Sequence, residues 1–380
     1  MQFPVKHSST GTTIFTVMSG LAAQYQAINL SQGFPDYPLD PELSDLLGEA
    51  ATKGFNQYAP MPGLPMLREA ISNDWRKRNN VKIDADTEIT VTPGATYGIS
   101  TAFATILEAG DEAIVLEPAY DSYIPGIEMC GAKAVLVQLN YPSFSVDWNK
   151  VKDAITPKTK CIIFNTPHNP TGAVLSLQDL NTLADIIRDT NIVLISDEVY
   201  EQLIFDGLKH HSVLEHSELR QRSFAVFSFG KVFNNTGWKV GYTVAPPAFT
   251  AAYRAIHQYL CFTVNSPSQY ALAKFMAHTG LEPIGRVMER KRNYFLDLLR
   301  QTKFTIHQPT SGSYFQTASY ENISDLGDYE FAQWLTKEHG VATIPISSFY
   351  KSKKDDKVIR FCFAKKEETL NVAIKRLMEL

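Results

Sequence analysis

Short apolar runs alternate with helix-like patterns through the middle of the chain. Most of these runs are unbroken apolar stretches rather than alternations of apolar and polar residues. Apolar strands separated by helices predict a mostly parallel sheet that is covered on both faces, and hence an α/β fold. The predicted strands are EITVT (88–92), EAIVL (112–116), AVLVQL (134–139), CIIF (161–164), IVLIS (192–196), FAVFSF (224–229) and GYTVA (241–245).

The pattern changes after about residue 270. A long helical pattern covers roughly 281–300, a further helix is expected around 328–339, and a strand is expected over 357–364. In the closing helix the apolar residues recur at helical spacing, which predicts one buried face. These residues are Leu370, Ala373, Ile374 and Leu377.

Two domains are therefore expected. The first 40 residues are rich in Gly, Pro, Ser and Thr, and GFPDYPLDP (33–41) is typical of extended chain with turns. We expect a large α/β domain over residues 41–270. We expect a smaller α+β domain in which residues 1–40 pack with residues 271–380, and a chain of 380 residues is long enough for both.

Composition and charge exclude several classes of partner. The formal net charge is −4, so neither nucleic acid nor an anionic membrane is an expected partner. No run approaches the ~18 apolar residues of a spanning helix, and the N-terminal stretch does not resemble a signal peptide. The four cysteines are widely spaced, which is typical of free thiols in a reducing compartment. We expect a cytoplasmic protein.

Polar residues that can do chemistry follow the ends of the apolar runs. Ligands of open α/β sheets gather beyond the carboxyl ends of the strands. Each residue has an ordinary alternative: an Asp can cap a helix, a Lys is usually solvated, and a Tyr or Asn can serve a turn. Five separate strand ends would have to present such residues together by chance, so we favour a shared site. The residues are Gly94, Ala95, Thr96, Tyr120, Asn165, Asn169, Asp197, Tyr200, Ser228 and Lys231.

This set fits pyridoxal phosphate (PLP), which needs partners for a phosphate, a ring nitrogen, a phenolic oxygen and an aldehyde. A helix start at Ala95 and Thr96 can bind the phosphate through free backbone N–H groups. The carboxylate of Asp197 can keep the ring nitrogen protonated. Lys231 can form an imine with the aldehyde, and its amine can later move a proton.

Further side chains complete the requirement. Asn169 and Tyr200 can hydrogen-bond the phenolic oxygen, and Tyr120 can stack on the ring. Lys239 follows Lys231 by eight residues and can meet the phosphate as a point charge. Arg360 lies in VIRFCF on the face opposite the apolar residues, and a guanidinium can bind a carboxylate through two hydrogen bonds. The alternative for Arg360 is an ordinary solvent-facing charge on a strand.

Four motifs carry a resemblance to a known family: SFGKVFNNTGWKVGY, NTPHNPTG, ISDEVYE and VIRFCFA. Together they resemble the fold-type-I PLP enzymes of the class I/II aminotransferase group, over essentially the whole chain. The resemblance implies a large, mostly parallel seven-stranded sheet domain and a smaller α+β domain. It also implies a Schiff base at Lys231, with Asp197 at the pyridine nitrogen and Asn169 and Tyr200 at O3′. The implied stacking residue is Tyr120, and the implied phosphate ligands are Ala95, Thr96, Ser228 and Lys239.

The resemblance also implies a homodimer with shared active sites. Tyr58, in NQYAPMPGLPMLREA, matches a tyrosine that reaches the phosphate of the neighbouring subunit. The family often has arginine where Lys239 stands, and lysine there is similar to the kynurenine/glutamine/methionine branch. GTTIFTVMSGLA, INLSQGFPDYP and HQYLCFTVNSP resemble the bacterial methionine aminotransferases especially closely.

The expected substrates are an L-amino acid and a 2-oxo acid, which react in turn in a ping-pong mechanism. Arg360 and Asn169 are expected to bind the substrate carboxylate, and Gly33 should let the backbone approach it. No second arginine can be assigned to a distal carboxylate, which disfavours strict aspartate specificity. The candidate pocket walls favour methionine or other unbranched or aromatic donors. Candidate pocket walls, for which core packing is an equal alternative, are Phe15, Phe34, Tyr37 and Phe349.

Other functions stay open. A cysteine-S-conjugate β-lyase or a kynurenine aminotransferase would share most of these residues. A non-catalytic PLP-binding module is more distant, because the sequence shows no helix-turn-helix or basic arm and every chemical position is filled. GxGxxG, GxxxxGK[ST], HExxH and GxSxG are absent. We expect no metal site, because the pair His210-His211 lies in a polar loop where solvation is the simpler expectation.

Overall fold

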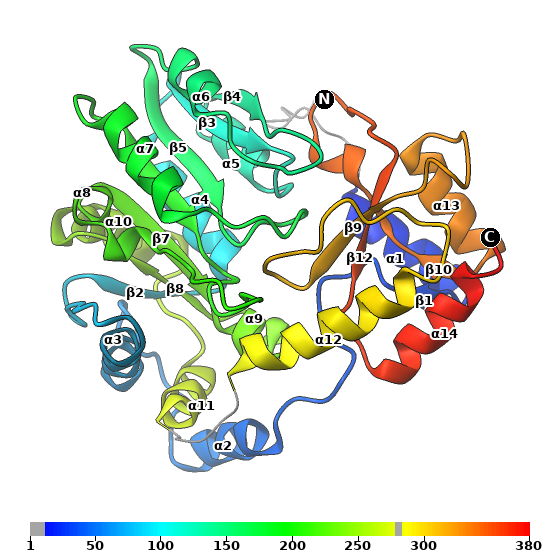
Figure 1. Ribbon diagram of the computed structural model, residues 1–380. Helices are drawn as coiled ribbons and strands as arrows, with labels where there is room; N and C mark the ends of the chain where they lie inside the picture. The colour runs from blue at the N-terminus through cyan, green and yellow to red at the C-terminus, as the bar shows by residue number, and fades with distance from the viewer. Residues whose placement is uncertain (1–11, 278–282) are drawn as a thin grey trace, which may run out of the picture.

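The computed structural model describes residues 12–277 and 283–380. Its main feature is a seven-stranded sheet with the order β2-β8-β7-β6-β5-β3-β4 (Figure 1). β8 is antiparallel to both of its neighbours, and the other pairs are parallel. The expected α/β fold with a mostly parallel sheet is confirmed. The strands are β2 (Ile89–Thr92), β3 (Glu112–Glu117), β4 (Lys133–Gln138), β5 (Thr159–Asn165), β6 (Val193–Asp197), β7 (Ser223–Ser228) and β8 (Gly241–Val244).

Both faces of this sheet are buried, which explains the unbroken apolar runs. In β5, Ile162 and Phe164 point into one core, while Cys161 and Ile163 point into another on the opposite face. The first face is covered by α2 (Pro41–Thr52), α3 (Pro65–Asn79), α6 (Trp148–Asp153), α7 (Leu177–Ile187), α8 (Ser217–Arg220) and α11 (Ser266–Met276). The second face is covered by α4 (Ala95–Ile106), α5 (Tyr123–Met129) and α10 (Pro247–Leu260).

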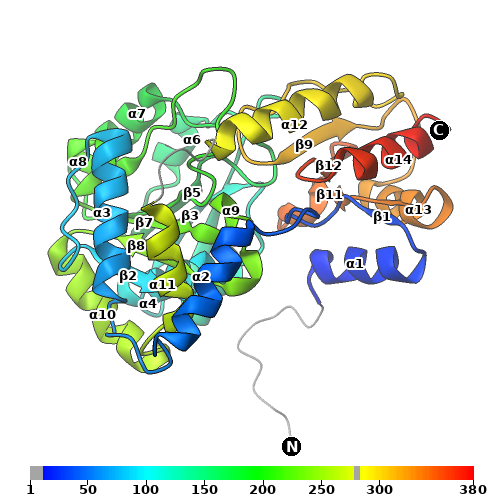
Figure 2. The same ribbon diagram turned by 90° about the horizontal axis from the view of Figure 1, so that it is seen from below.

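The first described segment of the chain and its C-terminal part pack together beside the large sheet (Figures 1 and 2). β1 (Ile28–Asn29) pairs with β10 (Val341–Ala342), and Met18 of α1 (Ile14–Gln24) shares a core with Ala332 of α13 (Asp328–Glu338). A separate antiparallel sheet has the order β11-β12-β9. The remaining elements here are β9 (Phe315–Ser319), β11 (Ile344–Pro345), β12 (Val358–Cys362), α12 (Ile284–Leu299) and α14 (Glu367–Leu377).

These cores support our proposal of two domains, 41–270 and 1–40 with 271–380. Residues 1–11 of the proposed small domain lie outside the described residues, as do positions 281 and 282 of the predicted long helix. The described part of that helix begins at Ile284. Among the described helices, none combines the length and the apolar character needed to span a membrane.

A glycine joins the two proposed domains. Gly172, in the NPTG motif, has φ +73°, and its carbonyl accepts hydrogen bonds from the backbone N–H groups of Ser311 and Gly312 at 3.2 and 3.0 Å. A Cβ at Gly172 would lie 1.6 Å from Oγ1 of Thr310. Only glycine therefore fits both the left-handed backbone and the close approach of the two parts of the chain.

We predict that Gly172→Ala lowers the thermal unfolding temperature strongly. Gly207→Ala is the matched control, because Gly207 has φ +70° but open space around its Cβ position. The free energy of unfolding of the control should fall by only ~1–2 kcal/mol, which is the cost of an alanine in the left-handed backbone conformation. Gly172→Ala should lose about 1–3 kcal/mol more, because Thr310 has to move. Equal losses in the two variants, measured by calorimetry, would contradict the close contact.

Candidate active site

The carboxyl edge of the large sheet opens into a cavity of about 230 Å³. The cavity brings together every predicted site residue except Tyr58, although these residues come from both proposed domains. They are Gly33, Ala95, Thr96, Tyr120, Asn169, Asp197, Tyr200, Ser228, Lys231, Lys239 and Arg360. The rule that places ligands beyond the ends of parallel strands therefore selects residues that do meet in space.

One end of the cavity can bind an anion. α4 begins directly after β2, and its N-cap residue Gly94 offers no side chain to cap the first N–H groups. These N–H groups are left for a ligand, as at other anion-binding helix starts. A Cβ at Gly94 would lie 3.2 Å from Nζ of Lys239, so this ammonium lies beside the helix start. Ser228, at the end of β7, lines the same cavity.

A buried carboxylate lies elsewhere in the cavity wall. Asp197 is the last residue of β6, and its side chain accepts hydrogen bonds from Oη of Tyr123 at 2.5 Å and from the backbone N–H of Val199 at 3.3 Å. Burial raises the pKa of Asp197 to about 6, and the Tyr123 hydrogen bond opposes this shift. Sequence reasoning missed Tyr123; its place in EPAYDSY, directly after a predicted strand and beside Tyr120, was the available signal.

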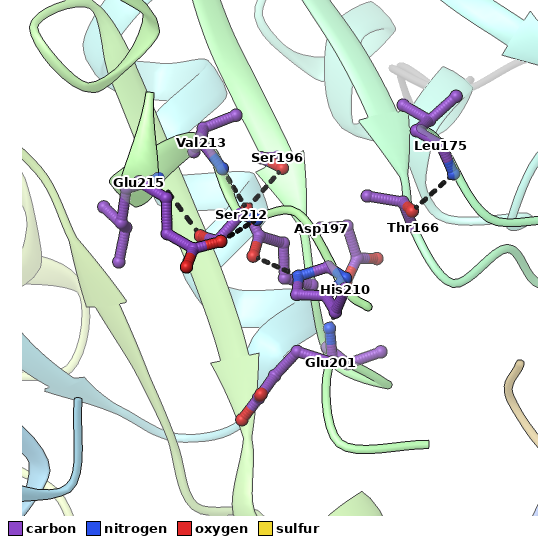
Figure 3. Close-up of polar contacts among 12 residues, drawn as sticks. Thr166, Leu175, Ser196, Asp197, Glu201, His210, Ser212, Val213 and Glu215 are labelled. Atoms are coloured by element: carbon purple, nitrogen blue, oxygen red, sulfur yellow. Dashed lines mark hydrogen bonds and ion pairs between the residues drawn. The ribbon is translucent and has the colours of Figure 1, made fainter. Parts of the chain in front are cut away.

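A second buried carboxylate, Glu198, directly follows Asp197 in the chain. Glu198 accepts hydrogen bonds from Oγ of Ser196 at 2.9 Å and from the backbone N–H of Val213 at 3.2 Å. Its other oxygen lies 2.7 Å from Nε2 of His210. Figure 3 labels Ser196, Val213 and His210, and a dashed line ends at each of them. His210 is buried, so the expectation that it is solvated is wrong. The reason is that a fully buried carboxylate needs polar partners, and this loop supplies them.

The amine of Lys231 lies in the same cavity as Asp197. Lys231 belongs to α9 (Phe229–Val232), which follows β7 at once, and its Nζ donates to Oη of Tyr314 at 3.0 Å and to the carbonyl of Gly33 at 3.3 Å. Desolvation lowers the pKa of Lys231 to about 8. A larger share of this amine is therefore neutral near pH 7 than is usual for lysine, which favours nucleophilic attack. Tyr314 was not identified from the sequence, because its loop is distant from the predicted strand ends.

Arg360 is fully buried on β12, so the alternative of a solvent-facing charge is wrong. Its Nη1 donates to Oδ1 of Asn169 at 2.5 Å, and its Nη2 donates to the carbonyl of Ser31 at 2.9 Å. The guanidinium carbon lies 3.8 Å from the ring centroid of Phe315. Its Nε has no hydrogen-bond partner among the described residues. A guanidinium has five N–H donors, so Arg360 can still bind a carboxylate.

Several predicted residues lie elsewhere. Tyr58 is 82% exposed, lies outside the cavity of its own chain, and packs edge-on against Phe262. Of the four candidate pocket walls, Phe15 lines the cavity, and Phe349 packs against Phe15 with 6.0 Å between ring centroids. Phe34 and Tyr37 are not among the described lining residues. Tyr37 packs instead against the core of the C-terminal part of the chain.

A flat, phosphate-bearing molecule fits this set of groups: it could place its phosphate at the start of α4, its ring near Asp197 and a reactive carbon near Lys231. The sequence profile of the family "Aminotransferase class I and II" matches residues 25–377. The chain therefore belongs to this family of aminotransferases, and it is an enzyme.

Three relatives show which aminotransferases the chain is similar to. The chain is 45% identical over 375 residues to methionine aminotransferase of Escherichia coli (strain K12), covering 97% of this chain and 96% of that protein. It is 37% identical over 382 residues to a probable N-succinyldiaminopimelate aminotransferase of Mycobacterium tuberculosis, with 97% and 96% covered. It is 33% identical over 414 residues to kynurenine–oxoglutarate transaminase of Dictyostelium discoideum, with 98% and 95% covered.

Solved structures agree with the sequence relatives. The crystal structure of YbdL from Escherichia coli, for which a methionine aminotransferase function was identified, has a TM-score of 0.96 and 44% sequence identity, and 100% of both chains is covered. N-succinyldiaminopimelate aminotransferase from Mycobacterium tuberculosis has a TM-score of 0.93 and 36% identity, again with 100% of both chains covered. The fold-type-I architecture is thereby confirmed.

We predict that Asp197→Asn stabilises the protein when no cofactor is bound. The folded-state pKa of about 6 lies above the ordinary value, so the charged form destabilises the fold. Protonation of Asp197 stabilises the folded protein. This stabilisation is fully present below the unfolded-state pKa of the carboxyl group, and it is lost as the pH rises through about 6. The free energy of unfolding of the variant should therefore exceed that of wild type by ~2–3 kcal/mol at about pH 8 and by little at about pH 4.

Thermal unfolding of the cofactor-free proteins at the two pH values measures this difference. Asp45→Asn is the control, because Asp45 is an exposed carboxylate on α2. A pH-independent gain in Asp197→Asn, or the same gain in Asp45→Asn, would show that burial of the Asp197 charge is not the cause.

Proposed function

We propose that this aminotransferase uses PLP to move the amino group of L-methionine, or of another unbranched or aromatic L-amino acid, to a 2-oxo acid. The observation that carries the proposal is the single cavity in which the amine of Lys231 lies with an anion-binding helix start, a buried carboxylate and a buried arginine. The 45% identity to a methionine aminotransferase over nearly the full length of both chains supports the choice of donor.

Named residues would hold the cofactor. The N–H groups of Ala95 and Thr96, with Ser228 and Lys239, would bind its phosphate, and Asp197 would hold the proton of its ring nitrogen. Tyr120 would stack on the ring, and Asn169 and Tyr200 would bind the phenolic oxygen. When bound, PLP supplies an electron sink for the electrons of a substrate bond. The lowered pKa of Lys231 favours the covalent attachment.

The chain's own residues then orient the substrate and move one proton. Arg360 would bind the α-carboxylate through its fork, and its bonds to Asn169 and Ser31 fix the plane of that fork. The amine of Lys231 would take the proton from the α-carbon and release it at the cofactor, as a general base and then a general acid. The ring of Phe15 would help to keep water from the reacting carbon. A second substrate, a 2-oxo acid, would reverse these steps.

The described lining of the cavity supports a neutral donor side chain. Its basic members are Lys231, Lys239 and Arg360, and each already has a role. A donor with a second carboxylate would therefore bury an unpaired charge, which is costly. Phe15 and Phe315 offer apolar surface instead. A kynurenine aminotransferase activity is the second candidate, supported by 33% identity to the Dictyostelium enzyme.

We also propose a homodimer. Four large apolar side chains lie exposed in two nearby loops and a helix end, and Tyr58 contacts Phe262 within this group. Exposed apolar groups of this kind are typical of an interface. The residues are Tyr58, Tyr259, Leu260 and Phe262. In such a dimer, Tyr58 would complete the anion site of the neighbouring subunit, which explains why it lies outside the cavity of its own chain.

We predict that L-methionine alone abolishes the visible absorption of the PLP-loaded enzyme, and that a 2-oxo acid then restores it. This cycle follows because each half-reaction of a ping-pong enzyme can be run separately. Lys231→Ala is the control, and its cycle should be slower by several orders of magnitude. An unchanged spectrum with methionine would reject this donor, and normal turnover by Lys231→Ala would reject the role of the lysine.

We predict that Arg360→Lys raises the KM for L-methionine about 10- to 100-fold, because a point charge replaces a two-bonded fork. Steady-state kinetics with varied methionine measures the change. Arg292→Lys is the matched control, because Arg292 is also buried but is paired with Asp206 outside the cavity. If both variants keep the wild-type KM, Arg360 does not bind the substrate carboxylate.

A further inference from the structure

Three distant parts of the chain meet at the amine of Lys231. Gly33 belongs to the N-terminal segment, Lys231 follows the large sheet, and Tyr314 precedes β9. Oη of Tyr314 donates to the carbonyl of Gly33 at 2.5 Å. Nζ of Lys231 donates to that same carbonyl at 3.3 Å and to Oη of Tyr314 at 3.0 Å. The three groups form a closed hydrogen-bonded triangle.

The number of available protons determines which group donates and which accepts in each hydrogen bond of this triangle. Tyr314 has one hydroxyl proton, and the carbonyl of Gly33 accepts it, so Tyr314 can only accept a hydrogen bond from Lys231. A neutral amine has two N–H bonds and one lone pair. The two oxygen atoms satisfy both N–H bonds, and the lone pair must then point away from them. Tyr314 is therefore an acceptor that orients the amine, and it is not a proton donor to it.

The two oxygen atoms are held rigidly. Tyr314 is 1% exposed, its ring packs edge-on against Tyr200 at 5.1 Å, and its backbone carbonyl accepts from the N–H of Phe363 at 3.1 Å. A Cβ at Gly33 would lie 2.7 Å from Cζ of Phe315, so a side chain at this position would push the aromatic rings away. The orientation of the Lys231 amine is thus set by packed groups from both proposed domains.

We propose that Tyr314 is a positioning residue for proton transfer, which with the carbonyl of Gly33 turns the lone pair of Lys231 toward the substrate α-carbon. This inference rests on the proposed function. In the step, the lone pair takes the α-proton, and the electron pair of the C–H bond passes to the electron sink that the cofactor supplies. The resulting ammonium keeps its bonds to the two oxygen atoms and gives the proton up at the cofactor, which restores the neutral amine.

The first experiment compares Tyr314→Phe with wild type in the methionine half-reaction, using ordinary and α-deuterated L-methionine. Loss of the orienting oxygen should slow the reaction about 10- to 100-fold with little change in KM. The primary isotope effect should rise, because proton transfer becomes slower than the other steps. Tyr320→Phe is the matched control, since Tyr320 is also fully buried but donates to the carbonyl of Leu326 outside the cavity.

A merely structural role predicts a different result. It would lower the unfolding temperature in both variants and leave the isotope effect of Tyr314→Phe at the wild-type value. That unchanged isotope effect overturns the inference even if the rate falls.

A second experiment tests the contact without any cofactor. The rate at which Lys231 reacts with trinitrobenzenesulfonate, followed by peptide mass spectrometry across a range of pH, gives the pKa of its amine. Removing an acceptor disfavours the charged amine, so Tyr314→Phe should lower this pKa and Tyr320→Phe should not. An identical profile in wild type and Tyr314→Phe overturns the inference. If wild type ignores methionine, the proposed donor fails, and this profile still decides the role of Tyr314.

Discussion

A guanidinium with no exposure to water lies where the two proposed domains meet, and the rest of the site depends on how it is satisfied. Burying an unpaired charge would cost several kcal/mol or more. Arg360 reduces this cost through Asn169 of the large domain, Ser31 of the N-terminal segment and the face of Phe315. Ser31 and Phe315 lie in the same proposed domain as Arg360, so the bond to Asn169 is the one that depends on how the domains dock. The same docking brings the carbonyl of Gly33 to the amine of Lys231, so both contacts link the two proposed domains at the cavity.

The site holds its charged groups at a cost to the empty protein. Burial raises the pKa of Asp197 and lowers those of Lys231 and Arg360, and in each case it disfavours the charged form. A bound anionic cofactor and a substrate carboxylate would supply the missing opposite charges. Groups that are poorly satisfied alone and well satisfied with ligands are typical of functional sites. The hydrogen bond from Tyr123 to Asp197 favours the carboxylate in the meantime.

The sequence predicted the parts that follow from local rules. Unbroken apolar runs located all seven strands of the large sheet, and the residues just after those strands meet in one cavity. Tyr314 and His210 could not be found in this way, because each reaches its partner through a loop whose path depends on tertiary packing. Tyr58 shows another limit: its expected partner is in a second chain, and no reading of one chain can place it beside that partner.

The pairing of the two chain ends, with β1 beside β10 and Met18 beside Ala332, also has a consequence for synthesis. On the ribosome, residues 12–40 emerge long before the polypeptide around residues 332–342 that they dock against. The large sheet can form in the interval, because its strands all lie between residues 89 and 244. The nascent chain must therefore carry the helix Ile14–Gln24 without its packing partners through most of translation.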